Sequence, residues 1–242
     1  MLTHAVIFAP IGQISRSEQI IQRLSNAIVT GLLEPHEQLP NEADLAKMMG
    51  VSHITVREAL NILRANNLIY TVRGRNGGSF VCENAQARGE GLHPFDTMSS
   101  DYLADLGEMH CAVISHCAGL ASRRMTPSDI ARFEEMVALF ASAHSPELKA
   151  QADLRCLLAL AAHSHSSRLA NQELQLQSEW APLVADLYQS GTVHQYTVDD
   201  YWALVEALRL RNPDRAVQAS TRLINELTAY LIENKLKHNR NL

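Results

Sequence analysis

The side chains best suited to chemistry in the first hundred residues are His53, Thr55 and Arg57, which open a segment with helical periodicity. Imidazole, hydroxyl and guanidinium groups at the start of a helix can hydrogen-bond to base edges and phosphates in the DNA major groove. Ser52, directly before them, is suited to cap the helix, because its hydroxyl can accept from the unpaired amides of the first turn. We therefore predict that these four residues belong to a helix that reads DNA.

The periodicity of this helix and the segment before it support that prediction. Apolar residues stand at i, i+3, i+4 and i+7, namely Val56, Ala59, Leu60 and Leu63. Such spacing is typical of the buried stripe of a helix. Upstream, residues 41–49 favour a second short helix, which Asn41 caps and Gly50 ends. Two short helices across a glycine turn predict a helix-turn-helix, with Asn41 close to the DNA.

A basic hairpin follows the reading helix. Residues 68–72 and 79–82 have strand-like composition, and the turn between them holds Arg73, Arg75 and Gly77. The arginines can reach phosphates or the minor groove, while glycine lets the backbone come close to DNA. An ordinary solvated hairpin would have the same composition. Because the hairpin follows a helix-turn-helix, we interpret it as a wing.

The spacing of these motifs resembles a known family signature. It comprises Leu39–Pro40–Asn41–Glu42, Leu45–Ala46, Val51–Ser52, Val56–Arg57–Glu58–Ala59–Leu60 and Leu63. This pattern, over roughly residues 14–82, is similar to the winged helix of GntR-type bacterial transcription regulators. The resemblance implies DNA binding. It does not imply the operator sequence, because Ala43 and His53 stand where the family usually has arginine.

Charge is distributed unevenly along the chain, which has a net charge of −5. Residues 50–82 hold four arginines against one glutamate, whereas residues 83–242 hold 14 basic and 20 acidic residues. Chance scatter could give such counts, but a basic patch on an acidic protein also fits a DNA-binding module joined to a different domain. We predict a winged helix-turn-helix domain over residues 1–82, whose first helix spans residues 15–33. A linker would cover residues 83–100, and a second domain residues 101–242.

The second domain is predicted to be all-helical. Its apolar-periodic segments are residues 100–124, 127–143, 146–164, 167–189, 198–211 and 213–236. Polar residues suited to capping precede these segments, among them Thr126, Ser145 and Asn212, each followed by proline. Thr197 and Asp200 have the spacing of a capping box, and Pro182 is expected to kink or divide its helix. The fold class is therefore mainly α: a winged helix-turn-helix followed by an antiparallel bundle of six to seven helices.

This second domain resembles the effector domain of the FadR-like branch of the same family. In many of those proteins one aspartate and three histidines hold a divalent metal, and a carboxylate effector completes its shell. The matching positions here are Asp153, Leu157, Tyr201 and Leu223. Leucine offers no lone pair, and one carboxylate does not hold a transition metal, so we predict no metal cofactor. In the alternative, His110, His163 or His165 completes a metal site with Asp153, and the protein senses a carboxylate.

Without a metal, the bundle interior is predicted to hold a neutral, aromatic or lipid-like effector. The expected effector-binding residues are His110, Asp153, Cys156, Leu157, Tyr201 and Leu223. Of these, Asp153 and Tyr201 would orient the ligand, and Tyr201 is the expected hydrogen-bond partner of the carboxylate. The alternative is that these side chains only close the core, and that the helical domain serves dimerisation alone.

The remaining features exclude several function classes. Cys82, Cys111, Cys117 and Cys156 lack metal-finger spacing and are expected to be buried thiols in a reducing cytoplasm. The chain shows no long apolar run, no phosphate loop and no nucleophile elbow, so we expect neither a membrane protein nor an enzyme. We predict a cytoplasmic transcription regulator, a repressor, that binds double-stranded DNA at an inverted repeat as a homodimer and responds to a small-molecule effector.

Overall fold

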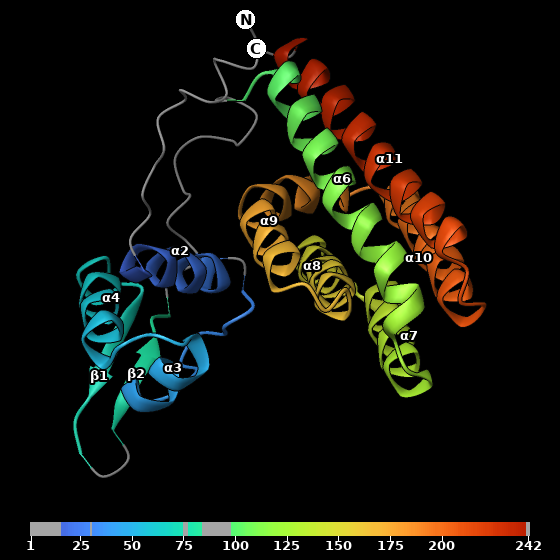
Figure 1. Ribbon diagram of the computed structural model, residues 1–242. Coiled ribbons are helices and arrows are strands. Elements are labelled where there is room, and N and C mark those ends of the chain that lie inside the picture. Colours follow the sequence, from blue (N-terminus) through green and yellow to red (C-terminus); the bar gives the residue numbers. More distant parts are fainter. Residues whose placement is uncertain (1–15, 30, 75–76, 84–97, 241–242) are drawn as a thin grey trace, which may run out of the picture. The chain divides into compact units, whose positions relative to one another are not determined.

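The computed structural model describes residues 16–29, 31–74, 77–83 and 98–240. The chain forms two compact units: an N-terminal unit with three short helices and both strands, and a C-terminal unit with six longer helices. Figure 1 shows both units. Most of the predicted linker, residues 83–100, lies outside the described residues. Its last residues are described, and Ser99 caps the first helix of the C-terminal unit by accepting from the Tyr102 amide.

The N-terminal unit is a winged helix-turn-helix, as predicted. Its elements are α2 (Arg16–Val29), α3 (Glu42–Met49), α4 (His53–Ala65), β1 (Ile69–Val72) and β2 (Gly78–Val81). The two strands pair antiparallel, with Ile69 opposite Val81. Helix α2 ends at Val29, before the predicted end at residue 33, and Gly31 follows with φ +73°. A positive φ stops helix propagation, so the glycine marks the turn as predicted.

The predicted caps and apolar stripe of the helix-turn-helix are confirmed. Asn41 and Ser52 accept hydrogen bonds from backbone amides in the first turns of α3 and α4, and Gly50 ends α3 with φ +64°. The stripe of α4 is buried: Val56, Ala59, Leu60 and Leu63 are each no more than 1% exposed. Residues of α2, α3 and both strands complete this small core. The packing holds the opposite face of α4 toward solvent.

The C-terminal unit is a bundle of six helices within the described residues. They are α6 (Ser100–Arg124), α7 (Pro127–Ser142), α8 (Pro146–His163), α9 (Ser167–Leu187), α10 (Gly191–Arg209) and α11 (Pro213–Arg240). The long helices α6 and α11 run side by side and antiparallel (Figure 1). Gly107 of α6 permits this close approach, because a Cβ there would lie 2.3 Å from the Thr228 hydroxyl oxygen. No helix among the described residues is long and apolar enough to cross a membrane.

One sequence prediction about these helices is wrong. Helix α10 begins at Gly191, not at residue 198, because Ser190 caps it by accepting from the Val193 amide. Thr197 and Asp200 therefore lie inside the helix and form no capping box. The Thr197 hydroxyl donates to the Val193 carbonyl oxygen (2.9 Å). Helix α9 continues through Pro182, so of the two predicted effects of this proline division is ruled out, and a kink stays a prediction.

The other predicted caps of the bundle are present. Thr126 and Asp129 form a reciprocal capping box at the start of α7. Ser145 accepts from the Leu148 amide at the start of α8, and Asn212 accepts from the Arg215 amide at the start of α11. Of the four thiols, two are buried (Cys117 and Cys156) and two only half-buried (Cys82 and Cys111), so the expectation of burial is met in part.

Candidate nucleic-acid interface and buried effector site

The solvent-facing side of α4 carries the side chains predicted to read bases. His53 and Arg57 are exposed, and Thr55 is half-buried. Ile54 is 70% exposed, although the sequence analysis did not single it out. An exposed isoleucine in the first turn of such a helix can contact a thymine methyl group. The face thus offers an imidazole, a guanidinium and an apolar group close to one another.

Ser52 and Asn41 are engaged in capping. The Ser52 hydroxyl accepts from the Thr55 amide (3.1 Å) and pairs with the Thr55 hydroxyl (2.8 Å). Asn41 Oδ1 accepts from the Asp44 amide (2.9 Å), and its side-chain amide donates to the Asp44 carboxylate (2.7 Å). Ser52 and Asn41 are nevertheless exposed. Their contact with DNA stays a prediction.

Arg57 is held by a residue that the sequence analysis did not select. Its Nε and Nη2 both donate to Glu42 Oε2, at 3.0 and 2.9 Å. The hydrogen bonds and the negative charge of Glu42 raise the pKa of the Arg57 guanidinium. The Arg57 side chain remains 65% exposed. Glu42 therefore orients a guanidinium that still has donors available for DNA. The sequence marked Glu42 only as part of the family motif and did not indicate this pairing.

The wing is short and its tip is tightly turned. Arg73 is exposed, whereas Arg75 lies outside the described residues. The Gly77 amide donates to the Gly74 carbonyl oxygen (2.9 Å). A Cβ at Gly77 would lie 2.4 Å from the Val72 carbonyl oxygen, so only glycine fits there. The turn therefore requires glycine at position 77 for its own geometry, whether or not it contacts DNA.

In the C-terminal unit, Asp153 and Tyr201 form the predicted pair. The Tyr201 hydroxyl donates to Asp153 Oδ1 at 2.5 Å, and both side chains are fully buried. Burial raises the pKa of Asp153 to about 6, while the hydroxyls of Tyr201 and Tyr188 act in the opposite direction. The hydrogen bond confirms the partner that the sequence predicted for this carboxyl group.

His110 does not pair with Asp153, but with a second buried acid. Its Nε2 lies 3.0 Å from Glu173 Oε1, which also accepts from the Gln177 side-chain amide (2.6 Å). The Trp180 ring packs edge-on against the imidazole, with ring centroids 4.5 Å apart. His110, Glu173, Gln177 and Trp180 each have 0% exposure. His110 and Glu173 both influence the pKa of Asp153, so the two groups lie within electrostatic reach of each other.

We call these side chains the buried polar cluster. Its members are His110, Asp153, Glu173, Gln177, Trp180, Tyr188 and Tyr201. They come from α6, α8, α9, the residue that ends α9, and α10. The sequence analysis missed the four contributed by the α9 region. A usable signal existed, because Glu173 and Gln177 lie on the same stripe of α9 as Leu176 and Trp180, and a polar residue on an apolar stripe is buried with it.

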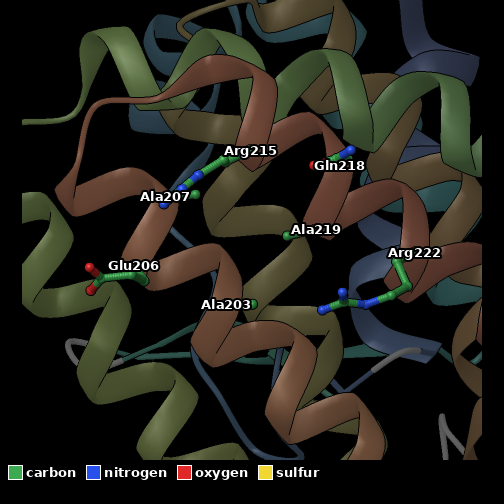
Figure 2. Close-up of a pocket in the computed structure, with 7 residues that line it drawn as sticks. All are labelled: Ala203, Glu206, Ala207, Arg215, Gln218, Ala219 and Arg222. Carbon is green, nitrogen blue, oxygen red and sulfur yellow. The ribbon is translucent and has the colours of Figure 1, made fainter.

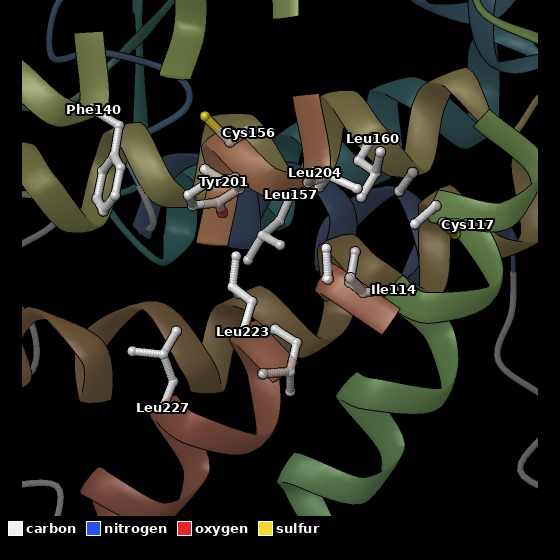
Figure 3. Packing of buried hydrophobic residues seen from close by; sticks show 14 of the residues in the cluster. Ile114, Cys117, Phe140, Cys156, Leu157, Leu160, Tyr201, Leu204, Leu223 and Leu227 are labelled. Atoms are coloured by element: carbon white, nitrogen blue, oxygen red, sulfur yellow. The ribbon is translucent and has the colours of Figure 1, made fainter. Parts of the chain in front are cut away.

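The other three predicted effector residues are apolar neighbours in the core. Figure 3 shows Leu157 and Leu223 pointing toward one another, with the Tyr201 ring beside Leu157. Leu157 and Leu223 are each 1% exposed, and Cys156 is fully buried. Burial raises the pKa of the Cys156 thiol, which therefore stays protonated at neutral pH. These three side chains offer packing surface and no charge.

Comparison with known proteins agrees with this architecture. The model for bacterial regulatory proteins of the gntR family matches residues 16–81, and the FCD domain model matches residues 105–226, about half of the chain. The chain belongs to the gntR family. It is a transcription regulator that joins a DNA-binding winged helix to an FCD effector-binding domain.

Individual relatives extend over nearly the whole chain. A putative HTH-type transcriptional regulator, RmpR of Mycobacterium gastri, is 35% identical over 237 residues, which cover 95% of this chain and 85% of the relative. The galactonate operon transcriptional repressor of Escherichia coli is 26% identical over 232 residues, which cover 91% of this chain and 98% of the relative. The solved structure of E. coli McbR/YncC has a TM-score of 0.55 at 20% identity, covering 92% of this chain and 99% of that one. The last of these supports the fold alone.

The FadR-like branch to which this regulator is similar implies a metal in the bundle, but the residues present do not fit one. Two of the four matching positions are leucines, and the Tyr201 phenol donates to Asp153 in place of ligating. His110, one of the candidate substitutes, is hydrogen-bonded to Glu173. Among the described residues, no three His, Cys, Asp or Glu side chains are grouped so as to hold a metal ion. The residues at these positions therefore do not supply a ligand set for a metal.

A surface groove of about 610 Å³ lies elsewhere on the domain, between α10 and α11. Its lining residues are Ala203, Glu206, Ala207, Arg215, Gln218, Ala219 and Arg222 (Figure 2). At its edge Arg222 is paired with Asp200 at 2.5 Å. None of the predicted effector-binding residues lines this groove, so the two features are distinct.

Proposed function

We propose that this gntR-family regulator is a repressor that binds an inverted-repeat operator as a homodimer and releases it when a small molecule occupies the buried polar cluster. The observation that carries the proposal is a group of buried polar side chains with unmet hydrogen bonds, located in a different unit from the reading helix. The galactonate operon repressor, similar along most of its length, supports the repressor role.

The DNA half of the proposal rests on α4 and the wing. His53, Ile54 and Arg57 would contact bases, while Arg73 and Arg75 would contact phosphates. A single reading helix offers only a few base contacts, so useful specificity requires two copies. We expect two half-sites related by a two-fold axis, one for each protomer.

The effector half rests on the C-terminal bundle. Side chains from four helices and the α9–α10 turn converge there, so a ligand among them would bias how the helices pack. A ligand can shift operator affinity only by as much as it discriminates between the two packings. We infer that no metal takes part, because Leu157 and Leu223 occupy positions that would have to supply ligands.

One observation favours a second candidate, a regulator that binds DNA constitutively and uses the helical domain only to dimerise. Leu157, Leu223 and their neighbours fill the bundle closely, with exposures of 1% or less. Ligand-induced stabilisation separates the two candidates, because a molecule that binds only the folded state raises its apparent stability.

The proposed function is tested by capturing fragments of the source genome with the purified protein. Enrichment of a shared inverted repeat, and loss of that enrichment with Arg57→Ala, is the expected result. The captured fragment then serves to ask whether small molecules that stabilise the protein also weaken DNA binding. Capture without any shared sequence would contradict sequence-specific regulation.

A further inference from the structure

The buried polar cluster contains side-chain atoms that have no hydrogen-bond partner. They are His110 Nδ1, Glu173 Oε2, Gln177 Oε1 and Trp180 Nε1, whereas the carboxyl group of Asp153 lies beside the hydroxyls of Tyr201 and Tyr188. Buried polar atoms in folded proteins are nearly always paired, and leaving one unpaired is costly. Four such atoms in one part of the bundle indicate an occupant that pairs with them.

The charge of the cluster is unsuited to an anion. It contains two carboxyl groups, Asp153 and Glu173, and its seven members include neither lysine nor arginine. Lys149 lies at the periphery, where its ammonium donates to the Tyr188 backbone carbonyl (3.3 Å). The titratable groups that act electrostatically on Asp153 are His110 and Glu173. A carboxylate ligand would therefore meet two buried acids without an arginine to bind it.

The unpaired atoms also distinguish an alcohol from an amine. Glu173 Oε2 and Gln177 Oε1 accept, whereas Trp180 Nε1 can only donate. An ammonium group supplies donors alone, so it would leave the indole N–H unpaired. A hydroxyl group both donates and accepts, and can therefore satisfy both kinds of atom.

We propose that the effector is an uncharged, polyhydroxylated small molecule whose hydroxyl groups bind between Glu173, Gln177 and Trp180. This inference rests on the proposed function, because it assigns a chemical class to the same site. It replaces the neutral aromatic or lipid-like ligand expected from the sequence, since the α9 side chains make the cluster more polar than the sequence analysis assumed. It also differs from the carboxylate that the family resemblance implies.

Matched ligands test the chemical class. Glucitol, gluconate and glucamine share a carbon chain and differ at the first carbon, which carries a hydroxyl, a carboxylate or an ammonium group. Glycerol, glycerate and 3-amino-1,2-propanediol form the same series at three carbons. At about 5 mM, well below the concentrations at which polyols stabilise proteins by exclusion, at least one alcohol should raise the Tm by about 2 °C or more, and its charged counterparts should not. A shift with the acid or amine only, or with no compound, overturns the proposal.

The location is tested by a fluorescence readout and a variant. Trp202→Phe leaves Trp180 as the only tryptophan, so the active alcohol should change its emission. Glu173→Gln removes one acidic acceptor and should weaken binding at least tenfold, whereas Glu134→Gln, the same change in an exposed pair with Arg209, should have no effect. If Glu173→Gln fails to fold, the emission of Trp180 still decides. An alcohol that stabilises the protein without changing that emission binds elsewhere, and the proposal fails.

DNA binding separates this inference from the proposed function. If gluconate binds and releases the captured DNA, effector control stands and the alcohol class is wrong. If glucitol or glycerol binds at Trp180 but leaves DNA affinity unchanged, the ligand class stands and effector control is wrong.

Discussion

Replacing Asp153 with asparagine should stabilise the C-terminal unit at neutral pH. Burial raises the pKa of this carboxyl group from 3.8 to about 6. The folded state therefore holds a proton on Asp153 over a pH range in which the unfolded chain has released it. Asp153 makes its full contribution to the free energy of unfolding well below pH 3.8. This contribution is lost as pH rises from about 3.8 to about 6, and the free energy of unfolding stays at the lower value above that. Since one pH unit corresponds to about 1.4 kcal/mol, the loss is about 3 kcal/mol.

Asparagine cannot ionise and avoids this loss. Its carbonyl oxygen can still accept from the Tyr201 hydroxyl, and its amide can donate to the Tyr188 oxygen. The stability of Asp153→Asn relative to the wild type should therefore increase by about 2.5 kcal/mol between pH 4 and pH 8.

The assay is urea unfolding followed by circular dichroism at several pH values, with Glu134→Gln as the control for an exposed acid. Comparing the variant with the wild type at each pH removes the contributions of all other titrating groups. A difference that stays constant from pH 4 to pH 8, or that turns against the variant as pH rises, would refute the reasoning about the buried carboxyl group.

Three further predictions concern DNA and metal. Arg57→Ala should weaken operator binding about tenfold to a hundredfold while leaving binding to scrambled DNA nearly unchanged. Glu42→Gln should weaken operator binding less. Unchanged operator affinity in the folded Arg57→Ala variant would count against the assignment. Arg73→Ala should weaken binding to all sequences alike and reduce the slope of log affinity against log salt by about one, whereas a change confined to one sequence would indicate base reading. EDTA should leave the Tm and the operator affinity unchanged. If elemental analysis found one metal per chain and Asp153→Ala removed it, the metal-site alternative would be correct.

Local sequence signals predicted the DNA-binding unit well, because its elements begin and end where short-range hydrogen bonds dictate. Ser52 caps α4 and Gly50 turns with a positive φ, and both requirements can be seen within four residues of sequence. The start of α10 was less predictable. Thr197 and Asp200 have the spacing of a capping box, but the cap is Ser190, earlier in the chain. Tertiary packing keeps the residues between Ser190 and Thr197 helical.

The buried polar cluster could be predicted only in part. Asp153 and Tyr201 were found because the family resemblance pointed to their positions. Glu173 and Gln177 were missed because single polar residues on a helix are usually solvated, and their burial depends on how α9 packs against other helices. Sequence alone also did not reveal that Glu42 binds Arg57. The two residues are 15 positions apart, on α3 and α4, and come together only because the chain turns between these helices.

Footprinting on a captured genomic fragment tests the central claim most directly. The intact protein should protect two half-sites of an inverted repeat, one for each copy of α4, and the concentration needed for protection should rise when the stabilising alcohol is added. Protection of a single asymmetric site, or protection that the alcohol leaves unchanged at saturating concentration, would contradict a dimeric regulator controlled through its helical domain.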